Sequence, residues 1–194
     1  MKPIYFHDTL KGKKVEFIPR TPGEVSMYVC GLTTSNDSHI GHARTAIVFD
    51  MIRKVFQRNE YKVRYVSNFT DIDDKIIQRS NEEKTSAKDL SEKYIKRYLD
   101  VIRKMHISEP DMYPRVTEHI PEIIDGVSKL IDNGFAYEMN GDVYFSVRSS
   151  KDYGKLSKRN PDDLLSGARI KVCNLKRDPL DFALWKMAKP NEPS

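Results

Sequence analysis

The apolar and polar residues of this chain follow two periods, one typical of strands and one typical of helices. Residues 25–29 form a short apolar run that predicts a buried strand, and from Ile40 to Phe56 the apolar residues recur at helical spacing. Residues 62–69 alternate between polar and apolar, which predicts a second strand. A strand, a helix and a strand in this order predict two parallel strands joined by a right-handed crossover.

Three further segments have helical patterns. The first runs from Asp71 to about Arg79, and the other two are amphipathic and cover residues 86–105 and 118–133. Ser86 or Thr85 is the expected N-cap of the second helix, since Asp89 follows at the spacing of a capping box. Gly134 is the expected C-cap of the third.

The last third of the chain predicts β-structure. Asn140-Gly141 separates two short apolar segments, residues 135–139 and 142–147, and this is the strongest local signal for a hairpin. Another turn is expected near residues 10–14, between two short edge strands. Residues 177–187 are apolar enough to pack back on the body of the protein, with Trp185 as the anchor.

Composition narrows the class of protein. The chain has 194 residues, of which 39% are hydrophobic and 31% are charged, as expected for a soluble globular protein of one domain, or of one domain with an inserted module. It has no apolar run of the length of a membrane span and no N-terminal segment like a signal peptide. Two distant cysteines predict a reducing, cytoplasmic location. The net charge of +5 is compatible with a polyanionic partner but is weak evidence for one.

The connection from Cys30 to Arg44 is the candidate functional segment. It leaves the end of a predicted strand and enters the first turn of a predicted helix, where unpaired backbone N–H groups and the helix dipole favour an anion. His39 and His42 lie on the same side of this first turn, with Gly41 between them, so that a flat ligand can approach the backbone. The alternative is that both histidines are ordinary polar residues at a helix start.

This segment resembles the His-Ile-Gly-His signature of class I aminoacyl-tRNA synthetases, and with Cys30 nine residues upstream it is most similar to the cysteinyl-tRNA synthetase family. The similarity continues through nearly the whole chain, in the blocks Phe49-Asp50, Tyr65-Val66, Asn68 to Ile76, Thr117 to Pro121, Gly141 to Phe145, Asp152 to Ser157, Gly167 to Arg169 and Lys176 to Lys186.

The resemblance implies an α/β fold, namely the first half of a Rossmann-like (HUP-type) parallel sheet with an α+β connective insertion. The expected boundaries are a catalytic part over residues 1–111, the insertion over residues 112–187 and a tail over residues 188–194. It also implies the family reaction, in which cysteine and ATP form cysteinyl-adenylate and the cysteinyl group is then transferred to tRNA(Cys). ATP is the implied substrate, and zinc and magnesium are the implied metals.

The resemblance also implies roles for single residues. His39, Gly41 and His42 would bind ATP, with the two histidines stabilising charge on its phosphates. Gly31 and Thr33 match positions near the amino-acid pocket, and Cys30 matches a zinc ligand whose zinc binds the substrate thiolate. The other zinc ligands of the family and its second signature, Lys-Met-Ser-Lys-Ser, have no match in this chain, so the zinc site is expected to be incomplete and the chain inactive in amino-acid activation.

The turn after Cys30 departs from the family pattern. Leu32 replaces a proline, which predicts a more mobile turn, and Thr34-Ser35-Asn36 replaces Val-Tyr-Asp. Three interpretations stay open: a fragment of a synthetase, a truncated paralogue that binds a nucleotide, an amino acid or a partner, and a cysteine ligase of thiol biosynthesis. Self-association, or association with a missing C-terminal half, is expected because the uncovered surface should be apolar.

Two charged segments each have two interpretations. Asp71, Asp73 and Asp74 form a cation site, or they are carboxylates that complement a helix N-terminus. The second segment is basic. It is either a solvated face, or it makes weak contacts with phosphates, because the family resemblance implies that this region faces the tRNA acceptor end. It comprises Lys155, Lys158, Arg159, Arg169, Lys171, Lys176 and Arg177. Cys173 matches no ligand position and is not counted.

Overall fold

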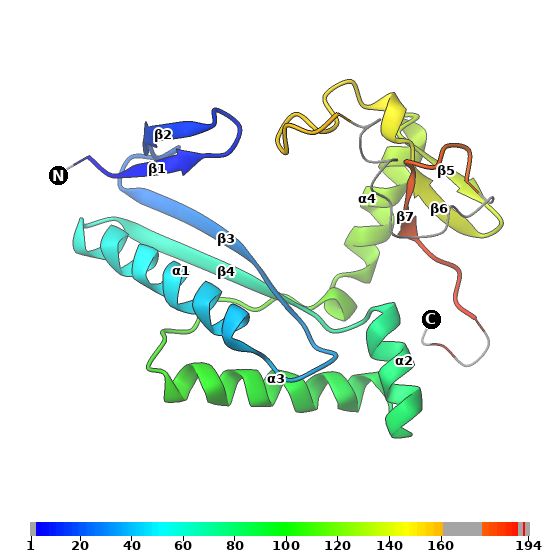
Figure 1. Ribbon diagram of the computed structural model, residues 1–194, viewed down its shortest axis with the longest axis horizontal. Helices are drawn as coiled ribbons and strands as arrows, with labels where there is room; N and C mark the ends of the chain where they lie inside the picture. Colours follow the sequence, from blue (N-terminus) through cyan, green and yellow to red (C-terminus); the bar gives the residue numbers. More distant parts are fainter. Residues whose placement is uncertain (1–2, 161–175, 190–191, 193–194) are drawn as a thin grey trace. The chain divides into compact units, whose positions relative to one another are not determined.

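The computed structural model describes residues 3–160, 176–189 and 192 (Figure 1). The chain divides into two compact units. Residues 18–120 form the first unit, and residues 4–17 together with residues 121–192 form the second. The domain boundaries expected from the sequence, at residues 111 and 187, stay a prediction.

The first unit is built on two long parallel strands, β3 (Glu24–Thr33) and β4 (Lys62–Thr70), joined by helix α1 (Ile40–Arg58). The predicted strand, helix and parallel strand are therefore confirmed. The segment around Met112 adds to the other edge of β4, since Ser67 N–H donates to the Met112 carbonyl.

The strand β3 runs further than the sequence predicted. Leu32, expected in a mobile turn, lies within β3 and is only 4% exposed. It packs with Phe69 of β4 and Ile95, which explains why the strand continues through this position. The prediction of a turn at residue 32 was wrong, because an apolar side chain here is held by the core.

Helices α2 (Asp74–Glu83) and α3 (Ala87–Lys104) follow β4 and pack on each other. Ser86 is the N-cap of α3, with its hydroxyl accepting from Asp89 N–H at 3.0 Å, so of the two expected caps Ser86 is the one used. The side chains of Ile76 and Leu90 are fully buried between the two helices. A short 3-10 turn, η1 (Val116–Glu118), ends the first unit.

Where it is described, the second unit contains two antiparallel sheets and the helix α4. Strands β1 (Tyr5–Asp8) and β2 (Lys13–Glu16) form the N-terminal hairpin. Helix α4 (Ile120–Asp132) begins two residues after the predicted start, because η1 occupies the preceding residues. Gly134 follows it with φ of +74°, as expected of a C-cap.

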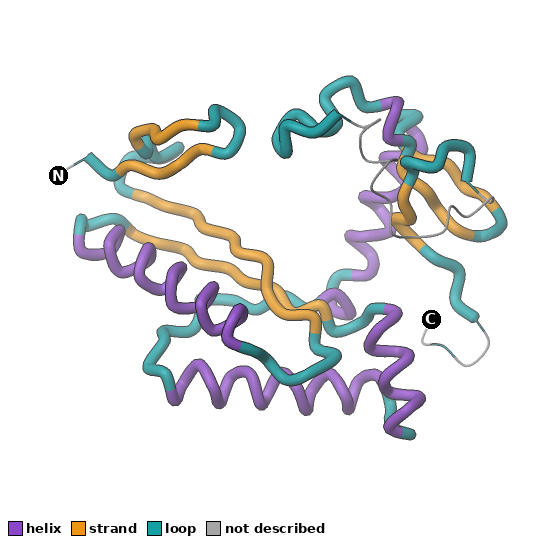
Figure 2. Tube along the Cα trace, viewed as in Figure 1, coloured by secondary structure: helices purple, strands orange, loops and turns teal. Residues whose placement is uncertain are grey.

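The predicted hairpin at Asn140-Gly141 is confirmed. It joins β5 (Ala136–Met139) and β6 (Asp142–Phe145), and both turn residues have positive φ. A second 3-10 turn, η2 (Val147–Ser149), follows β6. The strand β7 (Phe182–Trp185) then pairs with β6, so the expected return of the chain is also confirmed (Figure 2).

Asp181 fastens this return. Its side chain is 2% exposed and accepts from the Tyr137 hydroxyl at 2.7 Å and from Val147 N–H at 2.9 Å. Since both carboxylate oxygens have donors, the buried charge is compensated. The sequence also predicts short helix or turn segments around residues 161–165, which lie outside the described residues.

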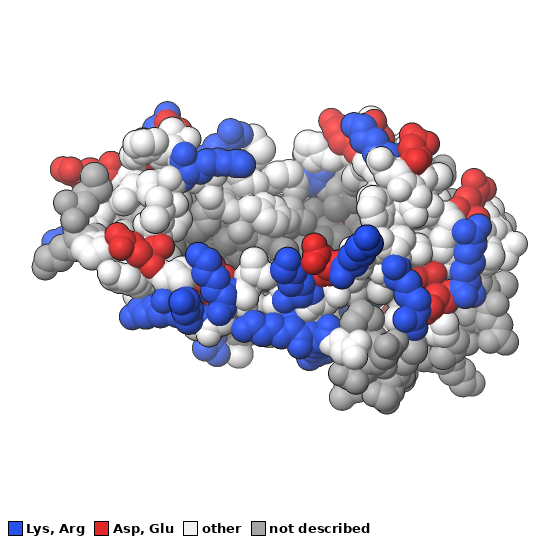
Figure 3. All heavy atoms as spheres, turned by 90° about the horizontal axis from the view of Figure 1, so that it is seen from above, with Lys and Arg blue, Asp and Glu red and all other residues white. Residues whose placement is uncertain are grey.

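The surface carries many charges. Lys and Arg side chains are frequent on the face drawn in Figure 3, with Asp and Glu between them, in keeping with the net charge of +5. Within the described residues, no helix is both long and apolar enough to cross a membrane.

Candidate functional site

The start of α1 is capped by its own two histidines. His39 is the N-cap residue, and its Nδ1 accepts from Gly41 N–H at 3.1 Å. His42 returns the bond, because its Nδ1 accepts from His39 N–H at 3.1 Å. This reciprocal arrangement is a capping box made of imidazoles, and it satisfies two of the N–H groups that a helix start leaves unpaired.

The caps fix the chemistry of both rings. A ring nitrogen that accepts a hydrogen bond carries no proton, so each neutral imidazole carries its proton on Nε2. The rings stack with their centroids 4.0 Å apart, which brings the two histidines together as the sequence predicted. Burial, and after it the neighbouring His39, lower the pKa of His42. In their neutral form the two rings therefore present two Nε2–H donors.

Gly41 is required by the histidine cap itself. A Cβ at this position would lie 2.9 Å from Cε1 and 3.0 Å from Nδ1 of His39. The sequence suggested that Gly41 makes room for a ligand. The structure gives an internal reason for the glycine, since any side chain here would push the His39 ring off its cap.

The other candidate residues lie at the end of β3. Cys30, Gly31 and Thr33 are all exposed, while Leu32 and Thr34 between and after them are buried. Gly31 approaches β4 so closely that a Cβ would lie 1.6 Å from the Asn68 carbonyl oxygen. Sequence reasoning placed Gly31 near the amino-acid pocket but did not find this close approach of the two strands.

Asn68 is a site residue that sequence reasoning did not single out. Its Oδ1 accepts from Gly31 N–H at 2.9 Å and from the Tyr28 hydroxyl at 3.0 Å. Burial, and after it the electrostatic influence of the neighbouring Cys30, raise the pKa of Tyr28. The only available signal was that Asn68 stands in a block of similarity, which carries no information on geometry.

The described residues do not make a zinc site. Zinc in proteins takes three or four protein ligands. Cys30 is a free, exposed thiol, and no group of three or more His, Cys, Asp or Glu side chains that could hold a metal occurs in residues 3–160, 176–189 and 192. One thiol does not fit a zinc ion by itself, so no step of the chemistry below passes through zinc. Cys173 lies outside the described residues.

The carboxylates after β4 act within the fold. Asp73 is the N-cap of α2, accepting from Lys75 N–H at 2.8 Å. Asp71 is 7% exposed and accepts from Thr117 N–H at 3.1 Å and from the Thr117 hydroxyl. These bonds favour the helix-start interpretation over a cation site.

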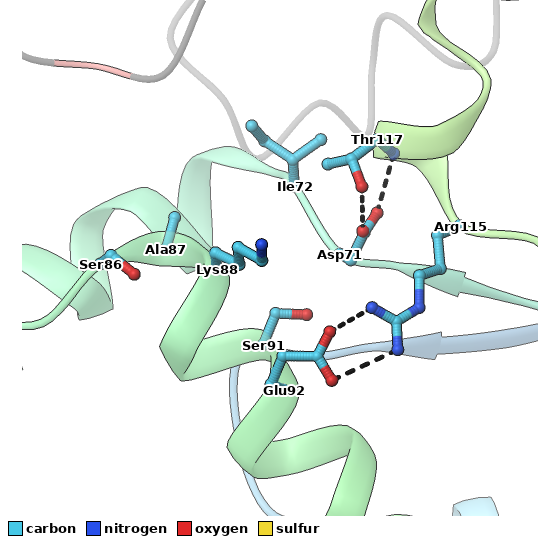
Figure 4. Close-up of a pocket in the computed structure, with 9 residues that line it drawn as sticks. All are labelled: Asp71, Ile72, Ser86, Ala87, Lys88, Ser91, Glu92, Arg115 and Thr117. Carbon is cyan, nitrogen blue, oxygen red and sulfur yellow. Dashed lines mark hydrogen bonds and ion pairs between the residues drawn. The ribbon is translucent and has the colours of Figure 1, made fainter.

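A cavity of about 400 Å³ lies beside Asp71. In Figure 4 Asp71 turns toward Thr117, and Glu92 turns toward the guanidinium of Arg115. Both carboxylates at the cavity are therefore engaged. The lining residues are Asp71, Ile72, Ser86, Ala87, Lys88, Ser91, Glu92, Arg115 and Thr117.

The altered turn after β3 is tied down by polar contacts. Thr34 is fully buried, and its hydroxyl lies 2.6 Å from that of Ser91 on α3. Asp37 forms a bidentate pair with Arg97, at 3.0 and 2.9 Å. The substituted residue Thr34 and the neighbouring Asp37 therefore attach this turn to α3.

Several members of the basic segment have internal partners. Lys176 donates to the Asp181 carbonyl, the Arg177 guanidinium lies 4.2 Å from the centre of the Tyr137 ring, and Lys155 pairs with Asp152 at 3.4 Å. Arg169 and Lys171 lie outside the described residues. Contact of this segment with tRNA phosphates stays a prediction.

Comparison with solved structures identifies the fold. Two structures of methionyl-tRNA synthetase from Mycobacterium tuberculosis, both with methionyl-adenylate, superpose with TM-scores of 0.55 and 0.56. They are 20% identical to this chain and cover 63% and 64% of it, which corresponds to 25% of each of those proteins. The fold is that of the Rossmann-like catalytic domain of class I tRNA synthetases, as the sequence predicted.

Sequence comparison identifies the family within this fold. The family model described as tRNA synthetases class I (C) catalytic domain matches residues 16–194, and the chain belongs to this family. Similar curated proteins are the cysteine–tRNA ligases of Sulfurihydrogenibium sp. (54% identical), Persephonella marina (52%) and Aquifex aeolicus (50%), which cover 97–98% of this chain. The chain spans 39% of the length of each of these relatives.

Proposed function

We propose that this chain supplies the ATP-phosphate side and the cysteine-facing strand end of a cysteine–tRNA ligase. In this reaction the cysteine carboxylate attacks the α-phosphate of ATP, cysteinyl-adenylate forms and pyrophosphate leaves, and tRNA(Cys) then receives the cysteinyl group. The proposal includes ATP, cysteine and tRNA(Cys) as ligands and the cytoplasm as the location. It is supported by the family and by the imidazole cap at the start of α1.

The cap supports a specific role for the two histidines as hydrogen-bond donors to phosphate. With both Nδ1 atoms accepting hydrogen bonds and both protons on Nε2, neither ring has a free lone pair to act as a base. Each ring can donate one hydrogen bond from Nε2 toward a phosphate oxygen. Because these donors are held in place before the reaction, they stabilise negative charge as it builds up on the phosphates.

The surroundings of His42 also favour the neutral form of its ring. Burial and the stacked neighbour lower the pKa of His42, so at pH 7 the ring is a donor without a full charge. The positive end of the helix dipole adds to the attraction for phosphate. Zinc and magnesium stay implied by the resemblance, and they have no assigned ligand set among the described residues.

The test is the affinity of the 194-residue chain for ATP, measured by titration calorimetry. We expect His39→Ala and His42→Ala each to weaken binding at least about tenfold, which corresponds to about 1.4 kcal/mol. His7→Ala is the matched control, because His7 lies on the exposed strand β1. Equal affinities for all four proteins would overturn the proposal.

Cysteine-dependent ATP–pyrophosphate exchange separates binding from catalysis. We expect the chain to bind ATP without exchange. Exchange by the chain alone would show that the second signature of the family is dispensable here.

A second candidate function is that of a non-catalytic binding module. It is favoured by the turn at Thr34 and Asp37, which is attached to α3 rather than left open. In that case ATP would bind, but a cysteinyl-adenylate analogue would bind no more tightly than the analogue without its cysteinyl group. The proposed ligase site predicts a clear gain from the cysteinyl group.

A further inference from the structure

The pairing of β3 with β4 changes register near its end. From Glu24 to Val29 each residue of β3 faces the residue 38 positions later, since Glu24 pairs with Lys62 and Val29 with Ser67. After the irregularity, Leu32 pairs with Phe69, which is 37 positions later. One additional residue is therefore inserted into β3 at Cys30–Gly31. This is a β-bulge.

The bulge decides which side chains reach the open face. Successive residues of a regular strand point to opposite faces, so Cys30 and Thr33 would lie on different faces. The inserted residue shifts this alternation by one position. Cys30 and Thr33 are both exposed, and Leu32 and Thr34 are both buried. The bulge thus brings both candidate cysteine-facing side chains to the exposed side.

A single side chain holds the bulge. Where the ladder is interrupted, Gly31 N–H donates to Oδ1 of Asn68 instead of to a carbonyl group. The same Oδ1 accepts from the Tyr28 hydroxyl, and Tyr28 precedes Cys30 by two residues on the same exposed face. Two donors on one oxygen also fix the orientation of the amide, whose Nδ2 lies 3.4 Å from the Thr70 hydroxyl.

We infer that Asn68 is a positioning residue for the cysteine site, acting through the β3 bulge and the Tyr28 hydroxyl rather than by touching the reacting atoms. This inference rests on the proposed function and names a residue for the cysteine half of it. Asn68 keeps Cys30 and Thr33 on one face, so losing its Oδ1 lets the strand end relax toward regular alternation.

The first measurement follows the Gly31 amide by NMR hydrogen exchange in the 194-residue chain. Asn68→Ala removes the acceptor, and we expect Gly31 exchange to accelerate at least about tenfold while the Val29 amide is unchanged. Asn68→Asp keeps the acceptor oxygen and should preserve the protection. Asn59→Ala is the matched control, because that side chain bonds only within the end of α1.

The second measurement addresses cysteine recognition. We compare the affinity for cysteinyl-sulfamoyl-adenosine with that for adenosine sulfamate, so that the ratio isolates the cysteinyl group. We expect Asn68→Ala to lower this ratio at least about tenfold and Asn68→Asp to restore most of it, with ATP affinity unchanged. Tyr28→Phe should have a smaller effect, since the Gly31 bond is retained.

The outcomes separate the two proposals. A wild-type chain that binds neither ATP nor the analogues contradicts the proposed function, and Gly31 exchange then decides whether Asn68 holds the bulge. A normal ratio in Asn68→Ala, with wild-type recognition intact, overturns the positioning role alone. A reduced ratio that Asn68→Asp fails to restore also overturns it, because the acceptor oxygen would then not be the cause.

Discussion

Helices α1 and α3 both accompany the strands β3 and β4, but they distribute their apolar residues in opposite ways. In α3 the apolar side chains of Leu90, Ile95 and Ile102 are almost completely buried, and the exposed positions are largely charged. In α1 small residues, Ala43 and Ala46, provide much of the buried face. Of the large apolar side chains of α1, Phe56 is buried, whereas five others are exposed: Ile40, Ile47, Val48, Met51 and Val55.

This difference in apolar burial indicates that α3 and α1 have different roles within the first unit. The helix α3 has a buried apolar face and an exposed charged face, so burial within this unit explains its sequence. The helix α1 begins with the imidazole cap and leaves an apolar face that no described residue covers. The proposed function assigns a ligand to one end of α1, and we expect contacts outside this unit along its length.

The largest expected effect tests this contrast directly. Leu90→Ala in α3 should destabilise the protein by about 2–5 kcal/mol, because a fully buried side chain leaves a cavity. Met51→Ala in α1 should cost less than about 1 kcal/mol, since Met51 is 60% exposed. Urea unfolding followed by circular dichroism measures both, and equal losses would remove the distinction between the helices.

The next effect concerns the start of α1. Gly41→Ala should weaken ATP binding at least about tenfold, or about 1.4 kcal/mol, because the new Cβ displaces the His39 ring from its cap. Gly126→Ala is the control, since this helical glycine has open space around it. Unchanged ATP affinity in Gly41→Ala would show that the cap is not part of the binding site.

The exposed face of α1 predicts self-association of the chain. Met51→Lys should lower the average mass measured by light scattering toward that of a monomer, and it should change stability by no more than about 0.5 kcal/mol. Lys96→Met is the control, because it makes the opposite substitution, from lysine to methionine, on the exposed side of α3. A wild-type chain that is monomeric at high concentration would contradict this prediction.

The smallest expected effect concerns the pKa of His42 and its contribution to stability. Because the folded-state pKa of His42 is lowered, the unfolded chain binds more protons just below pH 6.5. The contribution of His42 to stability is therefore fully present above pH 6.5 and is lost as pH falls through that range. His39→Ala should raise the pKa of His42, measured by NMR, since the neighbouring His39 is, after burial, a cause of the lowering. A further decrease would contradict the stacked pair.

Sequence periodicity was sufficient for the elements but not for the details of the site. The alternation of residues 62–69, the Ser86 cap and the Asn140-Gly141 turn are local signals, and each was confirmed. The similarity of His39 and His42 to a known motif located the helix start. The tautomers of the two rings, in contrast, follow only from their hydrogen bonds in the structure.

The features that were missed depend on contacts between distant residues. The Gly31 bulge and its bond to Asn68 join positions 37 residues apart, so no local pattern reports them. Leu32 was expected in a turn because only its neighbours in sequence were considered, whereas Phe69 and Ile95 decide its burial. In α1, helical periodicity was correct as a sign of helix but did not tell which apolar positions face the core.

The fastening role of Asp181 has a consequence for synthesis of the chain on the ribosome. The hairpin of β5 and β6 emerges first, but Tyr137 and Val147 receive their acceptor only when Asp181 has been added, and β6 receives its second neighbour only with β7. Translation therefore passes through an interval in which this sheet has an open edge. Edges of this kind invite pairing with other chains, so the interval is a stage at which a chaperone would protect the nascent protein.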